Sequence, residues 1–343
     1  MENKGTIDVL IIGAGPSGLL LSYYLKQKKI SHLIIEKGDS VGFSWKMMPD
    51  RLKLITFWKS NNLIDLDLDY FDRNIQVTKN DFFNYLTKFQ TRFNLPIELK
   101  QNFTDLIKRE NNFLVKTETN EYQAQIVVDA RGYFSFPYIP CFINEKSNIE
   151  IIHSAKYKNP TQFQKHKRIL IVGKRLSAGQ IIEELFDANK EIFLSTKSLI
   201  QFSPPQWVMN IYLFYLNQLE KMIFYFDPSK KKNVDVKMDF KLKEILKKTK
   251  IFDQIEKIGH QQVYFKDGKT LEDVDAIIFA TGFLPKNIEL KNEFEDLILD
   301  NLFYIGRDNQ LSFTSRFLRG IRRDVPKLAN LIEGRLLSKN KSQ

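Results

Sequence analysis

Three glycines near the start of the chain have the spacing of a phosphate-binding turn. Gly13, Gly15 and Gly18 follow an apolar run over residues 9–12, and a helical pattern continues over residues 19–29. In a G-x-G-x-x-G turn the first glycine permits the tight bend, the second lets the backbone approach a pyrophosphate, and the third lets helix and strand pack closely. The helix N-terminus adds unpaired N–H groups and the positive end of a dipole. The pattern predicts dinucleotide binding by Gly13, Gly15, Pro16, Ser17 and Gly18.

An acidic residue ends the next predicted strand. This strand covers residues 31–36, and Glu36 lies 23 residues after Gly13. A carboxylate at about this distance accepts hydrogen bonds from a ribose diol, which strengthens the prediction of a dinucleotide site. The weaker alternative is a glycine-rich turn in some other α/β protein.

A second strand, turn and helix repeat this arrangement later in the chain. An apolar strand over residues 168–172 leads into Gly173, and Thr196 ends the strand that follows the next helix. Thr196 lies 23 residues after Gly173, which is the same offset as in the first unit. The chain therefore contains two units of the dinucleotide-binding type, with the same spacing between the glycine turn and the end of the next strand.

Each unit has a second strand, and the residues that end these two strands differ in charge. Glu36 suits the free ribose of FAD or NAD, whereas an acid would repel the 2′-phosphate of NADPH. Thr196 is neutral and is followed by Lys197, with Lys174 and Arg175 in the turn before it. We therefore expect FAD in the first unit and NADPH in the second, with NADH as a further donor. The alternative for Lys197 is a solvated surface lysine.

The second turn departs from the glycine pattern. Arg175 replaces the second glycine, and Ala178 replaces the third. Either the Arg175 side chain folds away and pairs with a phosphate through its planar fork, or the nucleotide binds weakly. We favour binding, because the rest of the unit is intact.

The two units predict an α/β protein with two Rossmann-like dinucleotide-binding domains, the second inserted in the first. We expect residues 1–155 plus 283–343 to form the FAD-binding domain and residues 156–282 to form the NAD(P)H-binding domain. Residues 207–250 read as an aromatic and lysine-rich helical excursion within the second domain.

Composition and charge argue against several other classes. The 343 residues carry a formal charge of +11, but the lysines are spread along the chain, which favours a compositional bias over a nucleic-acid-binding patch. Four histidines and one cysteine offer no spacing for a metal site. The single Cys141 permits no internal disulfide and predicts a cytoplasmic location, and the first strand begins too early for a signal peptide.

The most apolar later stretch covers residues 207–226. It contains asparagine, glutamine, glutamate and lysine, so it is too polar to span a bilayer. Contact with a membrane surface, a lid over a substrate and a homodimer contact are alternatives that the sequence does not separate.

Five segments resemble the flavin-containing monooxygenases and their bacterial relatives. Residues 36–45 resemble the E-K-x-x-x-x-G-G-x-W segment of that family, and residues 50–56 resemble the segment that follows it. Residues 153–157 are similar to the second half of the fingerprint F-x-G-x-x-x-H-x-x-x-[FY], and residues 279–285 to the A-T-G-[FY] motif. Residues 318–324 resemble the C-terminal helix of the small bacterial members.

Several positions depart from the family pattern. Phe43 replaces the second glycine of the G-G pair, and Ser147 and Ile149 occupy the Phe and Gly places of the fingerprint. The first A-T-G-like turn, at residues 130–132, contains Arg131 in its centre.

The resemblance implies a reaction in which NADPH reduces FAD and O2 then forms a flavin C4a-hydroperoxide. This species would oxygenate a soft nitrogen- or sulfur-containing, or a carbonyl, small molecule. Such chemistry depends on positioning and a dry pocket more than on an acid–base pair, so no catalytic residue is predicted and His153 is interpreted as structural.

The cofactor residues follow from the turns together with the resemblance. For FAD they are Gly13, Gly15, Pro16, Ser17, Gly18, Glu36, Lys37, Ser44, Trp45 and Thr56. For NADP they are Gly173, Lys174, Arg175, Ser177, Thr196, Lys197, Ala280, Thr281 and Gly282. The alternative for Thr56 is a simple strand-end threonine.

Two other functions remain open at this point. The first is an NAD(P)H:FAD oxidase or reductase that releases peroxide without oxygenating a substrate, and the second is a non-catalytic flavoprotein. A disulfide reductase is disfavoured, because that mechanism needs a redox-active cysteine pair and the chain has only Cys141.

Overall fold

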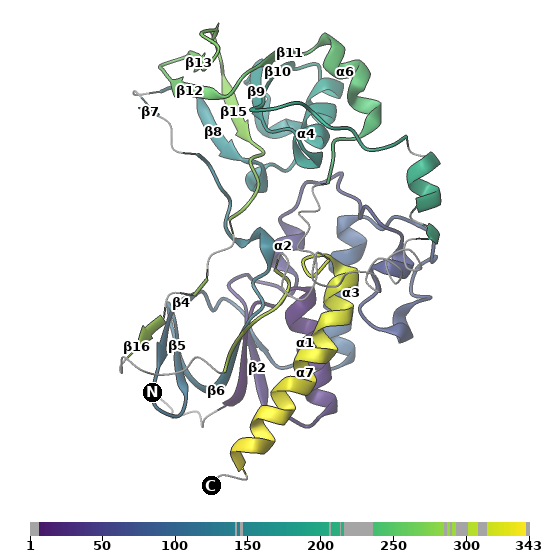
Figure 1. Ribbon diagram of the computed structural model, residues 1–343, viewed down its shortest axis with the longest axis vertical. Helices are drawn as coiled ribbons and strands as arrows, with labels where there is room; N and C mark the ends of the chain where they lie inside the picture. Colours follow the sequence, from purple (N-terminus) through teal and green to yellow (C-terminus); the bar gives the residue numbers. More distant parts are fainter. Residues whose placement is uncertain are drawn as a thin grey trace.

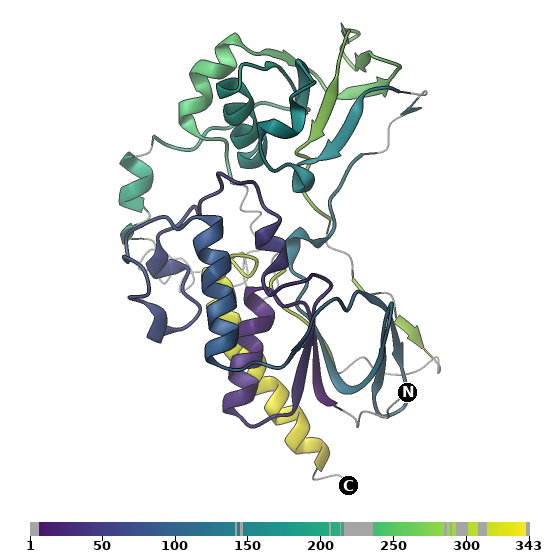
Figure 2. The same cartoon turned by 180° about the vertical axis from the view of Figure 1, so that it is seen from behind.

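The computed structural model describes residues 7–140, 143–144, 147–205, 207–212, 214–215, 236–284, 287–288, 290–292, 301–307 and 314–340. Cys141 and most of the stretch 207–226 lie outside the described residues. The described part has two lobes, each built around a twisted sheet and joined by a narrow crossing (Figures 1 and 2).

The lower lobe in Figure 1 contains an eight-stranded sheet. Its order is β16-β4-β5-β6-β1-β2-β3, and β17 pairs with the end of β6. The central strands are parallel and buried on both faces, which is why they read as unbroken apolar runs. The strands are β1 Ile7–Ile12, β2 His32–Ile35, β3 Ile97–Glu98, β4 Phe103–Lys108, β5 Phe113–Thr117, β6 Glu121–Asp129, β16 Leu290–Asn292 and β17 Leu302–Tyr304.

Three helices cover one face of this sheet (Figure 1): α1 Pro16–Gln27, α3 Lys79–Arg92 and α7 Leu318–Asn340. α1 begins at Pro16, earlier than the apolar pattern predicted, because proline suits the first helical position, where no backbone N–H is needed. Thr78 caps α3 as its sequence predicts, by accepting a hydrogen bond from the Asp81 N–H. The carboxyl ends of β1 and β6 are thereby held beside the N-terminus of α1.

The upper lobe contains a parallel sheet of order β11-β10-β9-β15-β8. Helices α4 Leu176–Asp187 and α6 Lys243–Lys248 pack on one face of it, and a sheet of order β14-β13-β12-β7 packs on the other. Residues 263–269 contain an Asp-Gly pair that predicts a hairpin, and β13 and β14 form one, with Gly268 at φ +77° in its turn. The strands are β7 Ile143–Asn144, β8 Glu150–His153, β9 Arg168–Val172, β10 Glu191–Ser195, β11 Lys250–Phe252, β12 Ile255–Ile258, β13 Val263–Phe265, β14 Thr270–Leu271 and β15 Ala276–Phe279.

Two segments cross between the lobes side by side. Pro137 and Phe283 form an antiparallel bridge, and the Tyr138 N–H donates to the Gly282 carbonyl at 3.0 Å. The chain leaves the lower lobe after β6 and returns to it with β16, which pairs with β4, and with β17, which pairs with β6. One parallel α/β unit is therefore inserted in another, as the sequence predicted.

The sequence alone predicts that the helix after the second turn begins at residue 178, and it leaves residues 50–56 open as a short strand or an extended loop. α4 begins at Leu176, two residues before the predicted start at residue 178. Residues 50–56 form no regular strand, and only Lys53 makes an isolated bridge to Thr78. This segment is instead a loop that joins the lobes, because the Asp50 N–H donates to the Lys158 carbonyl at 2.9 Å.

Candidate functional site

The first glycine turn has the close contacts that its sequence pattern requires. A Cβ on Gly18 would lie 2.0 Å from the carbonyl oxygen of Gly13, so helix and strand can approach only because this residue is glycine. Gly13 itself has φ +109°, a backbone conformation that favours glycine. A Cβ on Gly15 would meet nothing within 4 Å, and no side chain caps α1. The N-terminus of α1 is thus open above Gly15.

Glu36 lies at the edge of this turn and is buried. Its Oε2 accepts a hydrogen bond from the Ala14 N–H at 2.8 Å, and its Oε1 accepts one from the Gly38 N–H at 2.9 Å. Each carboxylate oxygen keeps a further lone pair that a ribose hydroxyl can use. The backbone therefore holds the carboxylate in place before any nucleotide arrives.

The segment after Glu36 folds over the same turn. The Gly42 N–H donates to the Ala14 carbonyl at 2.9 Å, and α2 Phe43–Lys46 begins directly after it. The Phe43 ring fills the space beside Gly38, where a Cβ would lie 2.2 Å from that ring. This packing explains how a phenylalanine can replace the second glycine of the family pattern.

The four other residues predicted to bind FAD differ in exposure. Lys37 and Ser44 are exposed, whereas Trp45 is half-buried and packs edge-on against Phe82, with ring centroids 4.5 Å apart. The Thr56 hydroxyl donates to Asn61 Oδ1 at 2.9 Å, so its proton is used within its own loop.

A carboxyl-terminal loop that the sequence analysis did not select also contacts the first turn. Gly306 follows β17, and a Cβ there would lie 2.5 Å from the Ser17 hydroxyl oxygen. Behind this loop Asp129 is fully buried at the end of β6 and binds two guanidinium groups. Arg131 donates to it at 2.7 Å, and Arg307 donates to it at 2.5 Å. This charge cluster fastens the loop to the sheet beside the turn.

The second turn brings its predicted residues together around Gly173. Gly173 has φ +148°, and a Cβ there would lie 2.5 Å from the Ala280 carbonyl oxygen. Lys174 leans toward the end of β10 and donates to the Ser198 hydroxyl at 2.5 Å. The Thr196 hydroxyl accepts from the Ser198 N–H at 3.2 Å, and Lys197 is exposed in the same loop. Cations therefore gather where β10 ends.

The residues that replace glycines in this turn cause no backbone strain. Arg175 is the N-cap residue of α4, with φ −111° and ψ −173°, and its side chain is exposed. Ala178 is buried against the upper core, whereas Ser177 is exposed. The Leu176 N–H donates to the Val236 carbonyl at 3.2 Å, at the place that Pro16 takes in α1.

The remaining predicted NADP residues belong to the crossing. The Thr281 hydroxyl donates to the Tyr138 carbonyl. His153 Nδ1 accepts from the Ala155 N–H at 3.0 Å, so its Nε2 carries the proton and donates to the Gly282 carbonyl at 2.9 Å. Burial lowers the pKa of His153 below its usual value, because the charged imidazole loses hydration. These contacts agree with a structural histidine.

Changing His153 to glutamine is expected to make stability less sensitive to acid. The unfolded chain binds this proton at about pH 6.5, whereas the folded chain binds it only at lower pH. The unfolding free energy of the wild type therefore decreases as the pH falls through this range. Urea unfolding at about pH 7.5 and about pH 5.5 should give a smaller difference in unfolding free energy for His153→Gln than for wild type. His32, whose pKa burial also lowers, is present in both proteins and cancels. An equal difference in both proteins would contradict the assignment.

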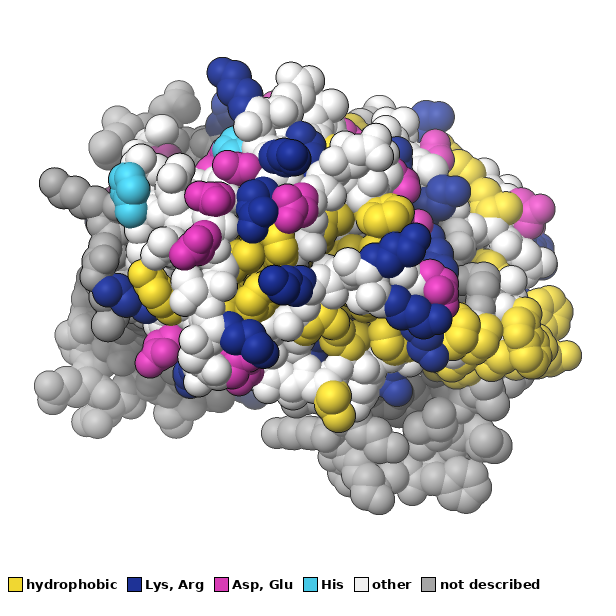
Figure 3. All heavy atoms as spheres, turned by 90° about the horizontal axis from the view of Figure 1, so that it is seen from above, with side chains coloured by type: hydrophobic (Ala, Val, Ile, Leu, Met, Phe, Trp, Pro, Cys, Tyr) yellow, Lys and Arg dark blue, Asp and Glu magenta, His cyan; other side chains and the backbone are white. Residues whose placement is uncertain are grey.

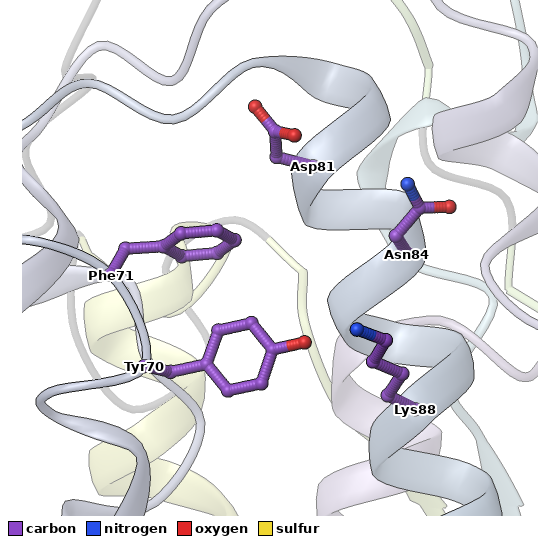
Figure 4. A pocket seen from close by; sticks show the side chains of 5 residues that line it. All are labelled: Tyr70, Phe71, Asp81, Asn84 and Lys88. Atoms are coloured by element: carbon purple, nitrogen blue, oxygen red, sulfur yellow. The ribbon is translucent and has the colours of Figure 1, made fainter.

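A hollow of about 430 Å³ lies beside α3 (Figure 4). The Tyr70 hydroxyl and the Lys88 ammonium group point into it from opposite sides, with Phe71 next to Tyr70. None of its lining residues is among those predicted to bind a cofactor.

Hydrophobic side chains gather at one edge of the molecule in Figure 3, on the side where Figure 1 places the helical residues 207–212 and 214–215. Trp207 is 68 % exposed, and Phe214 contacts the lower lobe through Lys59, whose ammonium group lies 4.1 Å from the ring centroid.

No helix in the described part of the chain is long and apolar enough to cross a membrane. Among these same residues no three histidine, cysteine or acidic side chains are grouped as metal ligands.

The sequence model of the pyridine nucleotide-disulphide oxidoreductases matches residues 10–302. The chain belongs to this family. Two bacterial relatives of this chain are oxidoreductases of similar length. The uncharacterized oxidoreductase CzcO of Bacillus subtilis is 30% identical, and the comparison covers 95% of this chain and 99% of the relative. The uncharacterized CzcO-like oxidoreductase of Geobacillus kaustophilus is 32% identical, and the comparison covers 94% of this chain and 97% of the relative. The probable indole-3-pyruvate monooxygenase YUCCA1 of Arabidopsis thaliana is 26% identical, with 94% and 89% covered. The prediction of an oxidoreductase is confirmed.

Solved structures of this fold include flavin-dependent enzymes. A flavin-containing monooxygenase from Stenotrophomonas maltophilia has a TM-score of 0.75 at 18% identity, with 96% of this chain and 99% of that chain covered. The enzyme OTEMO, solved in complex with FAD and NADP, has a TM-score of 0.75 at 14% identity, with 98% and 86% covered. These likenesses confirm the two-unit α/β fold.

Proposed function

We propose that this oxidoreductase is an FAD-dependent, NADPH-consuming monooxygenase that oxygenates a soft nitrogen- or sulfur-containing, or a carbonyl, small molecule. The observation that carries the proposal is the pair of glycine turns with the same spacing to the end of the next strand. In the first unit this strand ends at the Glu36 carboxylate, which backbone N–H groups bind, and in the second unit it ends at a group of cations. The relative named as a probable indole-3-pyruvate monooxygenase supports the same class of reaction.

The first turn fits FAD. Gly15 leaves open space at an uncapped helix N-terminus, which suits a pyrophosphate, and Glu36 presents fixed carboxylate oxygens to a ribose diol. The Gly42 N–H binds the Ala14 carbonyl and so holds the start of α2 beside the turn, while Gly306 lets the carboxyl-terminal loop approach Ser17. When bound, FAD supplies the redox chemistry by accepting a hydride from NADPH and passing the electrons to O2.

The second turn fits NADPH. Lys174 reaches the loop that follows β10, so its ammonium group and Lys197 flank the place that a 2′-phosphate would take beyond Thr196. No carboxylate ends this strand, in contrast to Glu36 in the first unit. Ala280 and Gly282 shape the crossing beside the turn through their backbone carbonyls.

The remaining parts of the proposal concern organisation. We propose residues 1–155 plus 283–343 as the FAD-binding domain, residues 156–282 as the NAD(P)H-binding domain, and the cytoplasm as the location. O2 and the small-molecule substrate are its partners, and a homodimer is compatible with the exposed aromatic side chains of the 207–215 helical segment.

The proposed function is tested by following the electrons from NADPH to the flavin and from the flavin to O2. Purified holoenzyme is mixed without air with NADPH, flavin absorbance is recorded, and isotope-labelled O2 is then admitted with a panel of thioethers, amines and ketones. We expect flavin reduction followed by label in a product. If the flavin is reduced but all the oxygen is released as hydrogen peroxide, the protein is an oxidase. If neither NADPH nor NADH reduces the flavin, both enzyme functions are wrong and a non-catalytic flavoprotein remains.

Changing Lys197 to alanine is expected to lower the preference for NADPH over NADH by about three- to tenfold, because one cation at the 2′-phosphate is lost. The ratio of kcat/KM for flavin reduction by the two nucleotides measures this preference. The matched control is Lys266→Ala, which removes an exposed lysine at the end of β13. An unchanged ratio would show that Lys197 is a solvated surface lysine.

A further inference from the structure

A segment of the lower lobe contacts the upper lobe in addition to the two crossing segments. It follows α2, which Figure 1 places at the end of the lower lobe that faces the upper lobe. The Asp50 N–H donates to the Lys158 carbonyl at 2.9 Å, and the Lys158 ammonium group donates to the Lys46 carbonyl at 3.2 Å. We call this contact, between residues 46–50 and residues 158–159, the interlobe contact.

The Asp50 carboxylate joins side chains from both lobes. Its Oδ1 accepts a hydrogen bond at 2.8 Å from the ammonium group of Lys79, the first residue of α3 in the lower lobe. Its Oδ2 accepts one at 2.6 Å from Asn159 Nδ2 in the upper lobe. Asn159 Oδ1 accepts from the Thr161 N–H at 3.0 Å, which agrees with the amide group facing the carboxylate. The Lys79 side chain is only 5% exposed, so it holds Asp50 from a buried position.

Each side of the interlobe contact is connected to one of the two glycine turns. On the lower side, the segment that ends at Asp50 begins at Gly42, whose N–H donates to the Ala14 carbonyl of the first turn at 2.9 Å. On the upper side, the Tyr157 hydroxyl donates to Glu184 Oε2 in α4 at 3.1 Å, and both side chains are buried. α4 is the helix that follows the second turn. A shift at the interlobe contact would therefore move one turn relative to the other.

The relative position of the lobes matters because each carries one of the two nucleotides in the proposed function. Domains joined by small polar interfaces move relative to each other unless a contact restrains them. Two further contacts between the lobes, the ion pair of Arg51 with Asp187 and the hydrogen bond from Lys59 to the Phe214 carbonyl, are exposed. Exposed ion pairs contribute little. A displacement of about 1 Å between reacting groups slows a reaction by about a hundredfold.

We propose that Asp50 is a positioning residue, which holds the two lobes in the arrangement that allows hydride transfer from the nicotinamide nucleotide of the upper lobe to the flavin of the lower lobe. The inference rests on the proposed function and adds to it a residue outside the predicted cofactor sites. Lys79 fixes the carboxylate in the lower lobe, and Asn159 is its partner in the upper lobe. Disturbing this pair should slow the reaction between two nucleotides that both stay bound.

Replacing the donor at Asn159 by an acceptor tests the pair. Asn159→Asp keeps the oxygen that accepts from the Thr161 N–H, because aspartate and asparagine are equally good N-cap residues. It also places a second carboxylate oxygen where the amide now lies 2.6 Å from Asp50 Oδ2. The hydrogen bond from Lys79 lowers the pKa of Asp50, so at about pH 7.5 the two carboxylates are ionised and repel each other.

A second substitution should reverse this effect. Combining Asn159→Asp with Asp50→Asn exchanges the donor and the acceptor between the lobes, so the hydrogen bond across the interlobe contact is restored. The amide oxygen introduced by Asp50→Asn can still accept from Lys79. The matched control is Asn74→Asp, which makes the same charge change at an exposed position in a loop of the lower lobe.

Two measurements on the purified holoenzyme are compared for these variants. In stopped-flow experiments without air and at saturating NADPH, Asn159→Asp should reduce its flavin about ten- to hundredfold more slowly than wild type, with NADP+ affinity and flavin content unchanged. The combined variant should recover to within about threefold of wild type. Without nucleotide, hydrogen exchange in the peptide that contains residue 50 should be faster in Asn159→Asp alone, because the Asp50 N–H loses the Lys158 carbonyl. The control should match wild type throughout.

The possible outcomes separate this inference from the proposed function. If Asn159→Asp reduces its flavin at the wild-type rate, Asp50 does not position the lobes, and the inference is wrong while the proposed function stands. If the rate falls but the combined variant does not recover, or if NADP+ affinity falls as much as the rate, Asn159 acts by a route other than Asp50 and the inference is wrong as well. If neither NADPH nor NADH reduces the flavin of wild type, the proposed function itself fails, and the inference with it.

Discussion

Replacing Gly18 with alanine is expected to abolish most FAD binding and to destabilise the lower lobe. The added Cβ would lie 2.0 Å from the Gly13 carbonyl oxygen and 3.2 Å from its carbonyl carbon, so backbone must move and α1 must shift away from β1. Overpacking of this kind costs about 1–3 kcal/mol or more. The shift would also displace the helix N-terminus that faces the pyrophosphate. Flavin absorbance retained after gel filtration, together with the melting temperature, measures both effects.

Two other glycines provide matched controls for this prediction. A Cβ on Gly15 meets nothing within 4 Å, so Gly15→Ala should fold like wild type but bind FAD more weakly, because the methyl group enters the space above the turn. Gly334 lies within α7 with open space around it, so Gly334→Ala should keep its flavin and gain up to about 1 kcal/mol of stability from helix propensity. Full flavin content in Gly18→Ala would show that the first turn does not bind FAD.

Changing Asp129 to alanine should have the second large effect, a loss of about 3–5 kcal/mol in unfolding free energy. Asp129 is fully buried, and its carboxylate is the shared partner of Arg131 and Arg307, whose side chains are 21% and 11% exposed. Removing it leaves two guanidinium groups close together without their counterion. The loop that carries Gly306 would also lose its attachment beside Ser17, so flavin affinity should fall with stability. Urea unfolding of the apoprotein and FAD titration measure the two quantities.

The surface pair of Asp69 and Arg73 is the control for this charge cluster. Its two side chains are largely exposed, so Asp69→Ala should leave both the melting temperature and the FAD affinity unchanged. An Asp129→Ala variant as stable as this control would show that the buried cluster does not fasten the loop. Asp129→Asn keeps the shape but not the charge, and its stability should lie between those of wild type and Asp129→Ala.

The parts of the site that sequence predicted well are local. The first turn needs only the residues from Gly13 to Gly18 and the strand before them, because glycine conformations and helix starts are decided within a few residues. The position of Glu36 at the edge of the turn follows from the length of one βαβ unit. The repeat of that length at Gly173 predicted a second unit, which the fold confirms. Even Phe43 is explained within its own segment, by its contact with Gly38.

Other features depend on contacts between residues far apart in the chain, which no local pattern encodes. Arg307 binds Asp129 across 178 positions, and the pairing of β17 with β6 brings Gly306 to Ser17. At the second turn, the Leu176 N–H donates to the Val236 carbonyl, which belongs to a distant part of the chain. Sequence by itself therefore determined two dinucleotide-binding turns and the charge at the end of each unit, because these are set by short-range geometry. Tertiary structure alone decided which distant residues complete each turn, because that depends on how the strands pair and how the buried side chains pack.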